Sequence, residues 1–147
     1  MRSATTVTVA TFGTMAALAG LEHGVGEVRQ GDAGAPGTVF PSWPDSEWFA
    51  VLGGEPAMSV VPDRLITGTL AIAVSVIFWV WAVRFADTRH GGLVLALLSV
   101  LWLLVGGGFG PPLLGLILGA AASRIGRPLT SSRAHVLAGT RRALARS

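Results

Sequence analysis

Three stretches of this 147-residue chain contain no charged side chain, and they constrain its fold more than any other feature. They run from Ser3 to Leu21, from Leu65 to Val83 and from Gly91 to Ser123. A helix that rises about 1.5 Å per residue needs roughly 20 residues to cross the hydrocarbon core of a bilayer. Apolar residues make up 51% of the chain and charged residues only 13%, which is unusual for a soluble domain. We therefore predict an integral membrane protein.

The middle stretch is the simplest to interpret. Between Arg64 and Arg84 the sequence LITGTLAIAVSVIFWVWAV is apolar on all sides. Trp79 and Trp81 lie near its end, where indole rings favour the boundary between headgroups and hydrocarbon. Residues 64–84 are predicted to form a transmembrane helix.

The last stretch is too long for one crossing, because a single helix over it would measure about 50 Å against a core of about 30 Å. Its centre is rich in glycine and proline, which weaken or interrupt a helix. The predicted break consists of Gly106, Gly107, Gly108, Gly110, Pro111 and Pro112. Two short helices, about 91–107 and 111–124, are expected on either side of it. They form a tight hairpin that either crosses fully or stops below the far surface.

The first stretch has two interpretations. Arg2, a modest apolar region and Ala17-Leu18-Ala19 are typical of a signal peptide that is cleaved after Ala19. However, the region is rich in Thr and Gly instead of Leu, and its helical pattern continues beyond Gly20. We favour an uncleaved transmembrane helix over residues 4–26.

Small residues recur at intervals of four in two of the predicted helices. Such stripes let another helix approach closely, either within the chain or in a homo- or hetero-oligomer. The six predicted packing residues are Ala16, Gly20, Gly24, Gly115, Gly119 and Ser123.

The distribution of arginine predicts the orientation. With the first helix entering from the cytoplasm, nine of the eleven arginines lie inside and Arg29 and Arg64 lie outside, in accord with the positive-inside rule. The nine are Arg2, Arg84, Arg89, Arg124, Arg127, Arg133, Arg141, Arg142 and Arg146. We predict an all-α, four-helix transmembrane bundle over residues 1–126, multi-pass in the plasma membrane, with both termini cytoplasmic.

Two segments lie outside the predicted helices. In the outer loop, residues 27–63, Asp45 or Ser46 is expected to cap a short helix that lies on the membrane surface, and Ala57 to Val61 is expected to run extended over the bundle. Residues 127–147 are expected to form a basic cytoplasmic tail whose arginines contact anionic lipid headgroups. An amphipathic surface helix is one conformation that this tail can adopt. We predict no nucleic-acid partner, since the sequence pI of about 11.3 mostly reflects this tail.

Glu22, His23 and Glu27 form the best polar cluster, at the outer end of the first helix. His23 and Glu27 are four residues apart and share a helical face. Ionisable groups at membrane depth mark functional sites by default. A structural role, with His23 bound to Glu27 or to a loop carbonyl, is favoured over proton transfer, metal binding or ligand binding. His90 and His135 lie on the inner side and do not complete this site.

The sequence contains no recognisable catalytic constellation, and we predict that the protein is not an enzyme. It has no cysteine and no lysine, which excludes thiolate chemistry and Schiff-base catalysis. Zinc-protease, P-loop and nucleophile-elbow motifs are also absent from the sequence. No cofactor and no metal is assigned.

Four segments together resemble a family of small, uncharacterised bacterial integral membrane proteins. They are GLEHGVGE (20–27), LGGEPAM (52–58), RHGGLVL (89–95) and VGGGFGPPLLGLILG (105–119). The resemblance implies a membrane location and adds no catalytic residue. Two functional classes follow from the residues. The first is a non-enzymatic protein that packs helices or binds a partner through its small-residue stripes. The alternative is a small transport or permeation unit that uses Glu22, His23 and the break at 106–112.

Overall fold

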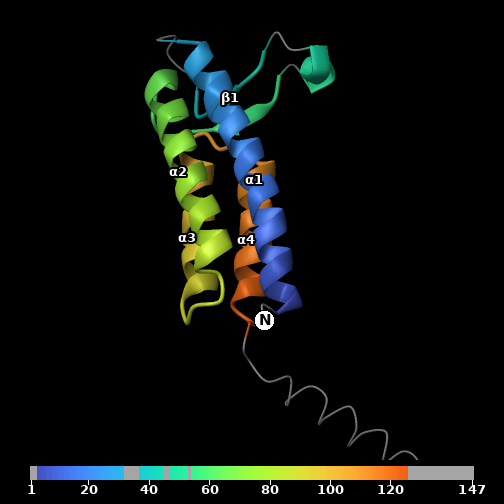
Figure 1. The fold of residues 1–147 in the computed structure, drawn as a ribbon. Coiled ribbons are helices and arrows are strands. Elements are labelled where there is room, and N and C mark those ends of the chain that lie inside the picture. The colour runs from blue at the N-terminus through green and yellow to red at the C-terminus, as the bar shows by residue number, and fades with distance from the viewer. Residues whose placement is uncertain (1–2, 32–36, 45–46, 53, 126–147) are drawn as a thin grey trace, which may run out of the picture.

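The computed structural model describes residues 3–31, 37–44, 47–52 and 54–125, which form four α-helices and a two-stranded antiparallel sheet. The helices are α1 (Ala4–Arg29), α2 (Arg64–Arg84), α3 (Gly91–Leu104) and α4 (Gly110–Ala122). They lie side by side in a bundle (Figure 1), which confirms the predicted helical class and its four helices. The predicted tail helix and the capping role of Asp45 or Ser46 lie outside the described residues.

Among the described helices, α1 and α2 are long and apolar enough to span a membrane. They have 26 and 21 residues, which corresponds to about 39 and 32 Å. Each begins at a side-chain cap: Ser3 accepts a hydrogen bond from the amide of Thr6 at 3.1 Å, and Asp63 accepts one from Ile66 at 2.8 Å. These caps fix where the two long helices start.

The hairpin of α3 and α4 is much shorter. These helices have 14 and 13 residues, or about 20 Å each. Gly106 and Gly108 adopt positive φ angles of 87° and 72°, a region that side-chain-bearing residues rarely occupy, so the chain turns here. Pro111 and Pro112 lie in the first turn of α4, where a missing amide proton costs no helical hydrogen bond. The turn between the two helices therefore follows directly from its glycines and prolines.

Small residues occupy the helix crossings inside the bundle. A Cβ atom on Gly24 of α1 would come within 2.8 Å of the Gly68 carbonyl of α2. A Cβ atom on Gly119 of α4 would come equally close to the Gly92 carbonyl of α3. Five of the six predicted packing residues are buried within the chain, and Ser123 is exposed. The stripes therefore bring helices of the same chain together.

Large apolar side chains cover the outside of the bundle. Each of the four helices exposes several of them, including Met15, Leu18, Ile66, Ile77, Leu93, Leu97, Leu113 and Ile117. Inside, the hydroxyls of Ser75 and Ser99 are fully buried and donate to carbonyls of their own helices. The surface of a soluble protein rarely carries large continuous apolar patches.

The segment between α1 and α2 closes over the hairpin. It contains β1 (Val39–Pro41), the 3₁₀-helix η1 (Glu47–Leu52) and β2 (Pro56–Met58), and β1 pairs with β2. The end of β2 and the residues after it bond to the hairpin: the amide of Gly106 donates to the Met58 carbonyl at 2.9 Å, and the amide of Val60 donates to the Leu104 carbonyl at 3.0 Å. These bonds fix the position of the residues just before β2.

Candidate functional site

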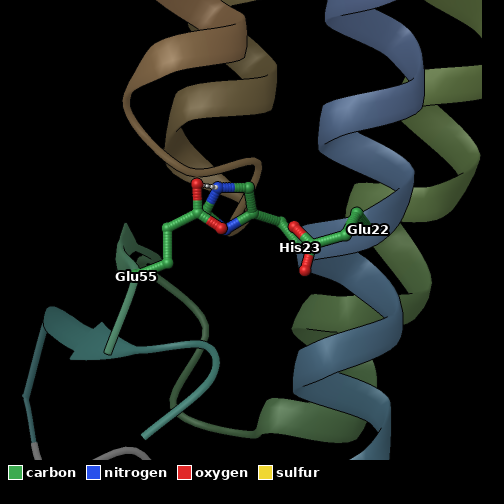
Figure 2. A group of neighbouring side chains, drawn as sticks. All are labelled: Glu22, His23 and Glu55. Carbon is green, nitrogen blue, oxygen red and sulfur yellow. Dashed lines mark ion pairs between the residues drawn. The ribbon is translucent and has the colours of Figure 1, made fainter. Parts of the chain in front are cut away.

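Three acidic and basic side chains converge where α1, the segment before β2 and the hairpin turn meet. Glu22 and His23 lie on α1. Glu55 is the residue before β2, and its side chain extends to the imidazole of His23 (Figure 2). One potential ligand atom from each residue lies within 4.8 Å of the other two. We call Glu22, His23 and Glu55 the outer triad.

His23 is buried, with only 1% of its side chain exposed. Its Nε2 atom lies 2.8 Å from Oε1 of Glu55, close enough for an ion pair. The carboxylate is not aligned for a directional hydrogen bond, however, so Nε2 has no hydrogen-bond partner among the described residues. On the other side of the ring, Nδ1 lies 3.3 Å from the hydroxyl of Ser42. The imidazole is thus held from one side and presents Nε2 to the triad.

Glu27 lies beside the triad and is linked to His23 through the Ser42 hydroxyl, which contacts both side chains. It is fully buried and accepts a hydrogen bond from the Ser42 hydroxyl at 3.3 Å. The Arg64 guanidinium attracts its carboxylate. Arg64 also donates to Gln30, whose amide donates to the backbone carbonyl of Ser42. Glu27 is therefore tied to a network that joins the end of α1, the start of α2 and the residue after β1.

The glycines of the hairpin turn pack directly on these groups. A Cβ atom on Gly106 would lie 2.5 Å from Oε2 of Glu27, and one on Gly108 would overlap the His23 ring. A Cβ atom on Gly107 would overlap the indole of Trp102. The turn can approach the site this closely because it carries no side chains.

Burial raises the pKa of the Glu55 carboxyl above its usual range, and its contact with Glu22 opposes part of that rise. Glu22 is exposed and Glu55 is partly buried. Within the described part of the chain, neither carboxylate forms an ion pair with an arginine. The outer triad therefore gathers two acids around one imidazole with no fixed cation paired to them.

The structure keeps the three residues that the sequence grouped together close to one another, because the Ser42 hydroxyl lies 3.3 Å from both Nδ1 of His23 and Oε1 of Glu27. Glu22 and His23 belong to the triad, whereas Glu27 contacts Ser42 and faces Gly106. The sequence did not single out Glu55 or Ser42, since neither lies near α1 along the chain. His90 lies in the connection between α2 and α3, at the other end of the bundle (Figure 1).

The fold and the site define a small helical bundle with a histidine–carboxylate cluster at the turn of a helical hairpin. No protein-family model matches the chain, and no curated protein or solved structure is significantly similar to it. The resemblance to small bacterial membrane proteins therefore stays a prediction.

Proposed function

We propose that this chain is a multi-pass integral membrane protein whose four helices cross or enter the bilayer. The exposed leucine, isoleucine and valine side chains of all four helices support this proposal, because lipid tails would cover them. Glycine, alanine and serine at the helix crossings support it as well, since membrane helices associate through small residues that permit close packing.

The proposed orientation follows from the two ends of the bundle. The start of α1, the connection between α2 and α3, and the end of α4 lie at one end, and the β1–β2 segment lies at the other (Figure 1). Eight of the eleven arginines precede α1, lie between α2 and α3, or follow α4 in the sequence, and Arg84 is the last residue of α2 at the same end. By the positive-inside rule that end is cytoplasmic, and the outer triad faces the opposite side.

We further propose that this membrane protein is a small transport or permeation unit that binds a cation at its outer end. The observation that carries this proposal is the packing of His23 and Glu27, both buried, against the non-helical backbone of Gly106 to Gly108. Ionisable groups in membrane segments are costly and are characteristic of solute pathways. Interrupted helices bind ions and substrates in many transporters.

The alternative, a protein that binds a partner through its small-residue stripes, has less support. Gly20 packs against Trp102, Gly24 against α2, and Gly115 against Phe78 and Ser99. These stripes are occupied within the chain and leave little small-residue surface for a partner.

The transport proposal is tested by recording charge movements from proteoliposomes on a solid-supported membrane after jumps in external Na⁺, K⁺, Mn²⁺ or Zn²⁺. We expect a protein-dependent current for at least one cation, and we expect Glu22→Gln to reduce it. Glu47→Gln, in η1 and outside the triad, serves as the matched control and should behave like the wild type. Currents indistinguishable from those of empty liposomes for all four cations would reject the proposal.

A further inference from the structure

The outer triad has the composition of a metal site, with one imidazole and two carboxylates whose ligand atoms lie within 4.8 Å of one another. We infer that Glu22, His23 and Glu55 bind one divalent transition-metal ion, with Zn²⁺ or Mn²⁺ as suitable probes. This inference deepens the proposed function by naming the class of cation, and it rests on the same outer site.

The geometry of the triad requires only small side-chain movements to accept an ion. Zinc holds nitrogen and oxygen ligands at about 2.0–2.2 Å, so the ligand atoms of one ion lie about 3–3.5 Å apart. The His23–Glu55 pair is already within 2.8 Å, and all three ligand atoms lie within 4.8 Å of one another. Glu22 is exposed and free to rotate its carboxylate toward the other two. Its exposure also provides an entry path from solvent.

His23 is positioned as a metal ligand. Nε2 of His23 is buried and lies 2.8 Å from Oε1 of Glu55 without an aligned hydrogen bond, so a metal ion bound between these two atoms would satisfy both. Its Nδ1 atom faces the Ser42 hydroxyl, the kind of contact that fixes the ring orientation of metal-binding histidines. Gly108 packs against the ring and limits its rotation. The Nε2 atom of His23 therefore points into the triad, next to Oε1 of Glu55.

Charge balance also favours a divalent ion. Two ionised carboxylates this close repel each other unless a proton or a cation lies between them. Two ionised carboxylates with a neutral imidazole carry a charge of about −2, which a divalent ion neutralises. Imidazole selects a transition metal over Ca²⁺ or Mg²⁺, which prefer oxygen ligands. Glu27 is not assigned as a ligand, because it already contacts Ser42 and is attracted by Arg64.

The test is isothermal titration of the full chain, purified in detergent without a histidine tag, with ZnCl₂, MnCl₂ and CaCl₂. We expect one Zn²⁺ per chain and much weaker Ca²⁺ binding. Glu22→Gln and Glu55→Gln each remove one ligand, so each should weaken Zn²⁺ binding at least about tenfold. Glu47→Gln should leave Zn²⁺ binding unchanged.

Equal affinities for Zn²⁺ in Glu22→Gln, Glu55→Gln and the Glu47→Gln control would overturn the inference, as would equal binding of Zn²⁺ and Ca²⁺. The outcome is separable from that of the transport proposal. Zn²⁺ binding without any cation current would support the metal site and reject transport. A Na⁺ or K⁺ current without Zn²⁺ binding would support transport and reject the metal site.

Discussion

The backbone of Gly108 lies directly against the imidazole ring of His23, with space for no side chain between them. Gly108 also adopts a φ of 72°. The turn of the hairpin and the most buried member of the outer triad are thus fixed by the same contact.

Gly108→Ala should destabilise the protein by about 2 kcal/mol or more, because it combines an unfavourable positive φ with overlap on His23. Thermal unfolding in detergent measures this effect. Gly110→Ala is the control, since nothing lies within 4 Å of its Cβ position and its φ is not positive. Its expected change is within about 0.5 kcal/mol. Similar unfolding temperatures for the two variants would show that the hairpin turn does not pack on His23 as described.

Gly24→Ala should weaken the contact between α1 and α2. The new methyl group would lie 2.7 Å from Ile72 and 2.8 Å from the Gly68 carbonyl, so the helices must separate. Overpacking of this kind costs about 1–3 kcal/mol. Val25→Ala, at a neighbouring exposed position, should have a smaller effect. The comparison again uses thermal unfolding, and a stabilised Gly24→Ala variant would contradict the close crossing of α1 and α2.

Replacement of Glu27 tests its buried contact with Ser42. Glu27→Gln keeps an oxygen that accepts from the Ser42 hydroxyl, whereas Glu27→Ala leaves that buried hydroxyl without this acceptor and creates a cavity. Loss of a buried hydrogen-bond partner costs about 1–3 kcal/mol. We therefore expect Glu27→Ala to unfold at a lower denaturant concentration than Glu27→Gln. The reverse order would contradict the assigned contact with Ser42.

Metal addition and removal should change stability by mass action. If the triad binds Zn²⁺ only in the folded state, free Zn²⁺ at 100 times its dissociation constant stabilises the protein by about 2.7 kcal/mol. Excess chelator should return the unfolding temperature to its metal-free value. Glu55→Gln should show a much smaller response than Glu47→Gln. A response of equal size in both variants would place the stabilising ion elsewhere.

The helical part of the fold could be predicted from the sequence because its signals are local. The charge-free stretches and the run of glycine and proline after Val105 indicate four helices and a break between the last two. The proximity of Glu22 and His23 follows from their adjacency on one helix. Periodicity alone could not reveal that Gly24 packs against Gly68, since each helix carries several small residues.

The complete triad could not be predicted, because Glu55 reaches His23 only through pairing between distant segments. β2 pairs with β1, and Gly106 bonds to Met58. The position of Glu55 is therefore set by contacts between segments that lie far apart in the sequence. The outer loop contains six carboxylates, of which Glu27 and Glu55 lie in segments that carry the family resemblance, but the resemblance assigns neither of them a role. The expected extended path of Ala57 to Val61 was the available signal, since it would place the preceding residue near the bundle.

Thiol labelling in intact cells tests most directly whether this is a multi-pass membrane protein with an outer site. The chain has no cysteine, so single cysteines can be introduced at exposed positions at the two ends of the bundle: Ala4, Gly37, Asp87 and Ser123. A membrane-impermeant maleimide should label the Gly37→Cys variant in intact cells. It should label the other three variants only after the cells are permeabilised.

This pattern would place the β1–β2 segment and the outer triad outside the membrane, with the start of α1, the connection between α2 and α3 and the end of α4 on the cytoplasmic side. Labelling of Ser123→Cys in intact cells would contradict a hairpin that returns to the cytoplasmic side. Equal labelling of all four variants in the soluble fraction would contradict the membrane assignment itself.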